Sequence, residues 1–150
     1  MARSPEGFFL CQRKYALDII NEVGLLEAKP VCVPIEQNHR LALFTSKFLI
    51  HREKYRRLVG HLIYLCFTRP ELSYSVHVLS QFMEQPREDH WQAALRVVRY
   101  LKQKPGPGIL LSSTCDLRRH GWCDADWAGC PITRRSLTGW LIFLGVSPIP

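Results

Sequence analysis

Pro105-Gly106-Pro107-Gly108 divides this sequence of 150 residues into two parts with different hydrophobic periodicity. Proline and glycine both oppose helix continuation, because proline lacks an amide donor and glycine loses much backbone freedom when it is ordered. Upstream of the break, apolar residues recur at helical spacing, whereas downstream they form short strand-like runs. The sequence therefore predicts an α+β chain, with a helical unit before residue 113 and a β-containing unit after it.

Several helices are expected upstream of the break. One lies within Gln12 to Val23, and Gly24 is placed to end it. Another begins near Glu53 and is apolar on much of its surface, which predicts that it is buried. A further helix starts at Thr68-Arg69-Pro70-Glu71, which has the form of a capping box with proline in the first turn. The last opens at Pro86 and continues to Lys104.

Short apolar runs predict the strands. Gly7 to Cys11 is apolar and aromatic, which suits a short, buried N-terminal strand. Ile109 to Leu111, Gly121 to Asp126 and Leu137 to Leu144 are the runs that follow the break. The segment from Ala28 to Arg40 contains two prolines and is expected to be a loop.

Composition and charge narrow the class of protein. The hydrophobic content of 47% argues against disorder, and no apolar run approaches the ~20 residues that cross a bilayer. The first residues lack the pattern of a secretory signal, so we expect an intracellular, soluble protein without membrane contact. The formal net charge of +7 favours anionic partners, nucleic acid first, although many basic proteins bind no specific partner.

The cysteine spacing does not match a common metal or redox motif. The sequence has 6 cysteines and no Cys-x-x-Cys pair, which leaves a zinc ribbon or a redox site without support. A loose metal cluster of Cys115, His120, Cys123 and Cys130 is an alternative. Reduced thiols in an intracellular protein are the favoured interpretation.

Asp124 and Asp126 form the one acidic pair that we single out as a candidate catalytic, metal-binding site. On an extended segment, carboxylates two residues apart project from the same face and can converge on one cation. Two-metal hydrolysis of a phosphodiester needs further carboxylates, so one strand supplies only part of such a site. The alternative is a solvated or turn-forming pair, although Trp122 and Trp127 beside the aspartates favour a structured setting.

Basic side chains of the helical part are the second candidate, because such a set can follow a phosphate backbone without reading sequence. The residues expected to bind nucleic acid are Arg56, Arg57, Arg96, Arg99, Lys102 and Lys104, with Arg52 and Lys54 nearby. The alternative is a solvated helix face.

Other conspicuous side chains are expected to be structural. Trp91 lies on the apolar stripe of its helix, so core packing is favoured over stacking on a base. His61 and His77 have no acid at a convincing sequence spacing, which favours structural roles for both.

Several segments occur in an order that matches one known family. They are Gln12 to Ala16, Lys29 to Pro34, Tyr55 to Leu65, Thr68 to Leu72, His90 to Ala94, Arg99 to Lys102, Asp124 to Gly129 and Arg134 to Trp140. Together they resemble the Pol polyproteins of copia-type long-terminal-repeat retrotransposons, especially those of plants. The match is collinear over nearly the whole chain, which makes it more specific than any single motif.

The resemblance implies a role for each part of the chain. Residues 1–112 would be the C-terminal region of a reverse transcriptase, with thumb- or connection-like helices that grip a template-primer duplex. Residues 113–150 would be the first strands of a ribonuclease H-like domain, incomplete in this sequence. Asp124 matches the first metal-binding carboxylate of that fold, Asp126 is a less certain ligand, and Mg²⁺ or Mn²⁺ is the implied metal.

The family's other catalytic carboxylates have no counterpart in this sequence. Neither the paired aspartates of the polymerase nor the later carboxylates of ribonuclease H are present, and Cys123 and Pro150 depart from the family pattern. We therefore expect no catalysis by the isolated chain. Two alternatives remain open: a non-catalytic module that binds an RNA/DNA duplex, and a metal nuclease that self-association completes.

Overall fold

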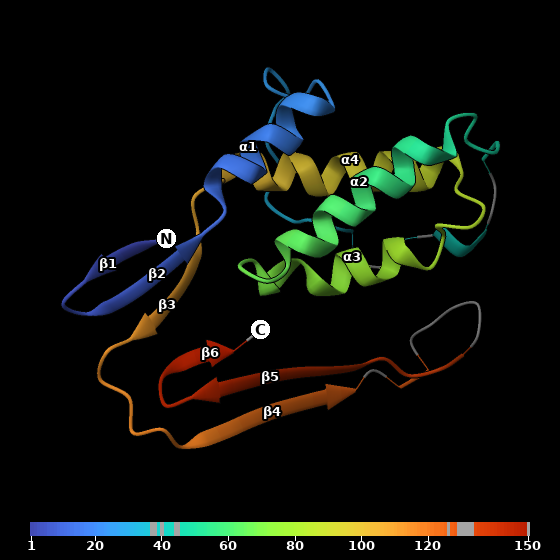
Figure 1. Cartoon of the computed structure of the whole chain (residues 1–150). Helices are drawn as coiled ribbons and strands as arrows, with labels where there is room; N and C mark the ends of the chain where they lie inside the picture. Colours follow the sequence, from blue (N-terminus) through green and yellow to red (C-terminus); the bar gives the residue numbers. More distant parts are fainter. Residues whose placement is uncertain (37–38, 40, 44–45, 126, 129–133, 150) are drawn as a thin grey trace. The chain divides into compact units, whose positions relative to one another are not determined.

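The computed structural model describes the chain except for residues 37–38, 40, 44–45, 126, 129–133 and 150 (Figure 1). It contains two compact units, one of Gln12–Pro107 and one that joins Met1–Cys11 to Gly108–Pro150. The boundaries of these units differ from the expected single boundary at residue 113. The reason is that Gly7–Cys11 pairs with Gly108–Ser112, so the first residues belong to the unit with the later strands and not to the helical unit. The mixed helix and sheet content confirms the α+β class.

Unit Gln12–Pro107 is a helical bundle. Its helices are α1 (Arg13–Glu22), α2 (Arg52–Leu65), α3 (Ser73–Ser80) and α4 (Glu88–Gln103), with short 3-10 turns η1 (Leu41–Leu43) and η2 (Pro70–Leu72). Helix α4 contacts α1, α2 and α3 (Figure 1). The fully buried side chains between them include Ile19, Ile20, Leu62, Leu65, Leu79, Val97, Val98 and Leu101.

Most of the helix predictions are confirmed. Helix α1 ends before Gly24, which has a φ of +70° that suits glycine at a helix end. Trp91 is partly buried and packs against the core, as its position on the apolar stripe predicts. Helix α2 buries one face only, because Ile63 and Tyr64 are about half exposed, so the prediction that it is largely buried is wrong.

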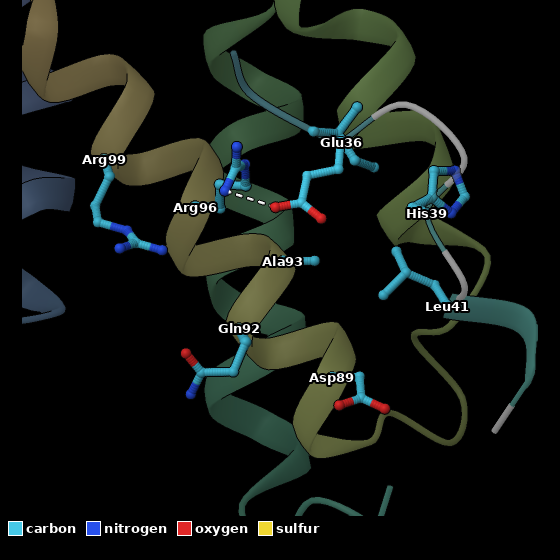
Figure 2. Close-up of a pocket in the computed structure, with 9 residues that line it drawn as sticks. Glu36, His39, Leu41, Asp89, Gln92, Ala93, Arg96 and Arg99 are labelled. Carbon is cyan, nitrogen blue, oxygen red and sulfur yellow. Dashed lines mark ion pairs between the residues drawn. The ribbon is translucent and has the colours of Figure 1, made fainter. Parts of the chain in front are cut away.

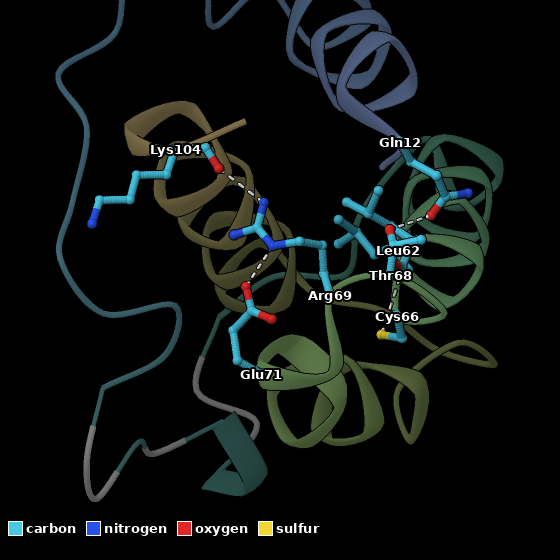
Figure 3. A network of polar contacts seen from close by, with 8 residues as sticks. Gln12, Leu62, Cys66, Thr68, Arg69, Glu71 and Lys104 are labelled. Atoms are coloured by element: carbon cyan, nitrogen blue, oxygen red, sulfur yellow. Dashed lines mark hydrogen bonds and ion pairs between the residues drawn. The ribbon is translucent and has the colours of Figure 1, made fainter. Parts of the chain in front are cut away.

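The predicted capping box at Thr68-Arg69-Pro70-Glu71 is wrong. The Thr68 hydroxyl donates to Gln12 Oε1 at 2.7 Å instead of capping a helix (Figure 3). Residues Pro70–Leu72 form the 3-10 turn η2 without a side-chain cap, and α3 starts only at Ser73. The threonine hydroxyl bonds a residue distant in sequence, so its local sequence pattern does not decide its role.

The second unit contains two antiparallel sheets. Strands β1 (Ala2–Ser4), β2 (Gly7–Cys11) and β3 (Gly108–Ser112) pair in the order β1-β2-β3. Strands β4 (Arg119–Ala125), β5 (Thr138–Leu144) and β6 (Ser147–Ile149) pair in the order β4-β5-β6. The predicted strands β2 to β5 are therefore present, whereas β1 and β6 are additions.

Glycines permit the close pairing of β2 with β3. A Cβ at Gly7 would lie 2.0 Å from the Leu111 carbonyl oxygen, and one at Gly108 would lie 2.1 Å from the Leu10 carbonyl oxygen. The expectation that β2 is buried is wrong, because Phe8 and Phe9 are 40% and 38% exposed. Successive side chains point to opposite faces of a sheet, and the described residues of this unit include no helix that could cover either face.

None of the helices in the described part of the chain combines the length and the apolar composition that crossing a membrane requires.

Candidate functional site

Asp124 lies near the end of β4, opposite Gly139 on β5. All residues of β4 are exposed, and Asp124 Oδ1 accepts the Ala125 amide at 2.9 Å. His120, Trp122 and Asp124 alternate along the strand and so share one face. The His120 ring stacks on Phe143 of β5 with centroids 5.5 Å apart. Asp124 is thus held on a regular strand, with its carboxylate open to solvent.

Asp124 is the one carboxylate that β4 contributes, and Asp126 lies outside the described residues. Among the residues that the structure describes, no group of three or more His, Cys, Asp or Glu side chains is placed to hold a metal ion. Cys115 and Cys123 carry reduced thiols, and Cys130 falls in the part that is not described. A single described carboxylate does not fit a two-metal site, which needs several, and we derive no metal-dependent step from it.

Arg56 and Lys102 hold the helical bundle together through backbone carbonyls. Arg56 Nε donates to Met83 O at 2.7 Å and its Nη2 to Glu84 O at 3.2 Å, which ties α2 to the segment after α3. Lys102 Nζ donates to Ala28 O at 2.6 Å. Both residues were predicted to bind nucleic acid, and both have a structural contact that the sequence pattern does not reveal.

Arg57 and Arg96 are engaged in ion pairs. Arg57 Nε lies 2.7 Å from Glu22 Oε1, and Arg96 Nη1 lies 3.0 Å from Glu36 Oε1 (Figure 2). The Arg57 side chain is largely exposed, so its pair is weakened by solvent, whereas only 25% of the Arg96 side chain is exposed.

Arg99 and Lys104 have side chains that remain available for a partner. Neither side chain makes an ion pair or hydrogen bond with the residues that the structure describes. Figure 2 shows Arg99 extending from α4, and Figure 3 shows the Lys104 side chain pointing away from its own backbone contact with Arg69. Of the six predicted cations, these two are the best placed to meet a phosphate.

A cavity of about 270 Å³ lies beside Arg99 and is lined by residues of α4 and by Ile35, Glu36, His39 and Leu41 (Figure 2). Two buried nitrogens there, His39 Nδ1 and Arg96 Nε, have no hydrogen-bond partner among the described residues. Burial lowers the pKa of His39 below its ordinary value. Because Glu36 and Asp89 also line this cavity, its charge is mixed and does not by itself select an anion.

His61 belongs to a polar network that the sequence did not predict. Its Nδ1 lies 2.7 Å from the Tyr15 hydroxyl and its Nε2 lies 3.4 Å from Glu22 Oε2. Glu22 also holds Arg57, so the network joins α1 to α2. Glu22 lies far from His61 in sequence, so the spacing did not reveal this acid, and the contacts agree with the structural role expected of His61. Burial raises the pKa of Tyr15, which makes its hydroxyl a poorer nucleophile and supports a structural role.

His90 is a buried structural residue that the sequence analysis missed. Its Nδ1 accepts the Arg87 amide at 3.0 Å, so the proton is on Nε2, which donates to the Leu41 carbonyl at 3.0 Å. The ring stacks on Phe82 with centroids 3.9 Å apart. Burial lowers the pKa of His90 and keeps the ring neutral. These contacts fix the start of α4.

Arg69 is 3% exposed and connects η2 to the end of α4. Its Nε donates to Glu71 Oε1 at 2.5 Å and its Nη1 donates to the Lys104 carbonyl at 2.9 Å (Figure 3). A buried guanidinium needs such partners, because an unpaired one would carry a large desolvation cost. The Thr68-Arg69-Pro70 segment therefore positions the C-terminal end of α4.

Comparison with known proteins shows which proteins the chain is similar to. The chain is 44% identical over 147 residues to the retrovirus-related Pol polyprotein from transposon RE2 of Arabidopsis thaliana, a match that covers 98% of the chain and 10% of the polyprotein. It is 39% identical to an uncharacterized mitochondrial protein of the same plant, over 97% of the chain and 60% of that protein. A second such mitochondrial protein is 44% identical over 55% of the chain and 79% of its own length.

The chain thus spans about a tenth of the length of the RE2 polyprotein. No family model and no solved structure matches it. The predicted relationship to retrotransposon Pol polyproteins is confirmed by nearly full coverage at this level of identity. The chain is thus related over 98% of its own length to the retrovirus-related Pol polyproteins from transposons.

Proposed function

We propose that the chain is a segment of a copia-type Pol polyprotein that spans the end of a reverse transcriptase and the first strands of a ribonuclease H-like domain. The observation that carries the proposal is the match to the RE2 polyprotein over 147 residues at 44% identity. The assignment to reverse transcriptase and ribonuclease H rests on two motifs that resemble the copia family, Tyr55 to Leu65 and Asp124 to Gly129. In this proposal residues 1–112 are the reverse transcriptase segment and residues 113–150 are the ribonuclease H-like segment.

The proposed activity of the isolated chain is binding of a nucleic-acid duplex without catalysis. A net charge of +7 supports attraction to a phosphate backbone. Arg99 and Lys104 on and after α4 are the proposed contacts, because their side chains have no described partner to give up. Arg56 and Lys102 would have to break contacts with backbone carbonyls before they could bind.

The proposal that the chain lacks turnover has two supports. The sequence contains no counterpart of the polymerase aspartates or of the later ribonuclease H carboxylates. Asp124 is solvent-exposed on a strand that contributes no second described carboxylate. A hydrolytic site with two metal ions needs more ligands than this.

Binding is tested by titrating the chain with an RNA/DNA hybrid at several salt concentrations. For a duplex the logarithm of the affinity should fall linearly with the logarithm of the salt concentration, with a slope of about −0.9 per phosphate contacted. Arg99→Ala and Lys104→Ala should each reduce the slope by about 1. Arg56→Ala is the matched control, since it removes the same charge from a tethered residue and should leave the slope within error of the unsubstituted chain. Salt-independent binding, or no binding at low salt, contradicts the proposal.

A further inference from the structure

Strand β4 is an edge strand with nothing paired along its outer side in the described part of the chain (Figure 1). It is 7 residues long and exposed throughout. The outer N–H and C=O groups of such a strand are a template for another strand, and proteins usually protect long exposed edges. This edge is not protected by a proline, and its one glycine leaves the strand regular.

The same hairpin exposes large apolar side chains. Trp122 and Trp140 are 69% and 72% exposed, and Leu141 and Ile142 are 40% and 46% exposed. Both tryptophans line an open depression of about 320 Å³ together with His120, Cys123 and Ile142. Added strands would extend this small sheet, and a partner would cover part of its exposed apolar surface.

We propose that β4 is the site at which two copies of this chain pair, antiparallel and edge to edge, so that their two sheets become one. In an antiparallel pair with twofold symmetry, opposite residues lie on the same face, so the axis passes through a residue position. One register alone pairs all 7 residues of β4 with their counterparts, and it places the axis at Trp122, the middle residue. This inference does not rest on the proposed function.

The sequence of β4 is complementary to itself in that register. His120 lies opposite Asp124 of the second copy, and Asp124 lies opposite its His120. All four side chains share one face of the joined sheet, on either side of the paired Trp122 residues. A shift by two residues in either direction separates both His–Asp pairs and leaves residues of β4 without a partner. Full overlap of β4 therefore selects this register, and the two His120–Asp124 pairs are compatible with it.

The register also places Gly121 opposite Cys123 of the second copy, which provides a direct test. Opposite residues of antiparallel strands have Cα atoms about 4.5–5.5 Å apart, within the range that a disulfide bridges. A side chain at Gly121 is tolerated, because a Cβ there would meet its nearest atoms at 3.6 and 3.7 Å. Gly121→Cys should yield a covalent dimer under mild oxidation, and Gly121→Cys combined with Cys123→Ser should not.

Gly139→Cys is the matched control for cross-linking. Gly139 lies on the inner strand β5, and a Cβ there would also have space, with its nearest atom at 3.9 Å. This variant should form no more covalent dimer than the unsubstituted chain. Equal cross-linking of the Gly121→Cys and Gly139→Cys variants would overturn the proposed register.

Exchange of the paired residues tests the interaction without a cross-link. His120→Asp places two acids opposite each other and Asp124→His places two histidines opposite each other, so each should weaken the dimer at least tenfold in sedimentation equilibrium. The double variant restores the pairing and should recover most of the affinity. Thr138→Asp adds an acid to β5 and should leave the affinity unchanged. A monomer at every concentration, or unchanged dimer affinity in both single variants, overturns the proposal. If a single variant fails to fold, the cross-linking result decides.

Discussion

Replacing Arg69 by alanine removes the buried connection between η2 and the end of α4. The side chain is 3% exposed, and its Nη1 donates to the Lys104 carbonyl at 2.9 Å. A hydrogen bond from a charged donor contributes about 1.5–3 kcal/mol. The ion pair with Glu71, whose side chain is 41% exposed, adds at most about 1 kcal/mol after solvent screening. We therefore expect Arg69→Ala to lower the free energy of unfolding by about 2–4 kcal/mol.

The assay is urea unfolding of the whole chain followed by far-UV circular dichroism, which reports mainly on the helical unit. Because thermal midpoints of units this size shift by roughly 4–8 °C per kcal/mol, the same variant should melt at least about 8 °C lower. Glu71→Gln is the matched control, since its amide oxygen can still accept from Arg69 Nε and the change should cost less than about 1 kcal/mol. An Arg69→Ala variant within about 0.5 kcal/mol of the unsubstituted chain would refute the structural role given to Arg69.

Three further predictions concern stability. The lowered pKa of His90 means that the unfolded state binds protons before the folded state does, so the unfolding midpoint of the helical unit should fall as the pH drops below about 6.5. A midpoint that rises over that pH range, measured by denaturant titration, would contradict the neutral, buried ring. Gly60→Ala in the exposed interior of α2 should stabilise the helical unit by about 0.5–1 kcal/mol, because a Cβ there meets no atom within 4 Å; a destabilised variant in urea unfolding would count against an open helix surface at this position. Gly108→Ala should weaken the pairing of β2 with β3, because the added Cβ would lie 2.1 Å from the Leu10 carbonyl oxygen. Amide hydrogen exchange of Leu10, whose backbone faces β3, should then be faster than in the control Gly106→Ala, whose added Cβ has 3.8 Å to its nearest atom, and equal rates would contradict the tight pairing.

The sequence predicted the elements whose signal is local and repeated. Helices α1, α2 and α4 follow from apolar spacing, and β5 follows from one continuous apolar run. The capping box failed because the partner of Thr68 is Gln12, which is 56 residues away in sequence. Strands β1 and β6 were missed because each has 3 residues, too few to show a period. Local patterns thus predicted these elements, but not the tertiary contacts of individual polar residues.

For the candidate sites too, local sequence patterns identified residues but did not show their tertiary contacts. Asp124 was singled out because it and Asp126 lie two residues apart on a segment expected to be extended, and the structure places Asp124 on strand β4. The six predicted cations could not be ranked from sequence, since nothing in the pattern shows that Arg56 reaches the Met83 carbonyl or that Lys102 reaches the Ala28 carbonyl. Only the folded arrangement sets Arg99 and Lys104 apart from the tethered residues.

The measurement that tests the central claim most directly is an assay of a labelled RNA/DNA hybrid with purified chain and Mg²⁺ or Mn²⁺, in which binding and cleavage are read from the same samples. The proposed segment of a Pol polyprotein should retard the hybrid at low salt, release it as salt rises, and produce no shorter RNA. Cleavage of the RNA strand that Asp124→Asn abolishes would contradict the account, because it would show a working nuclease site where we propose an incomplete one.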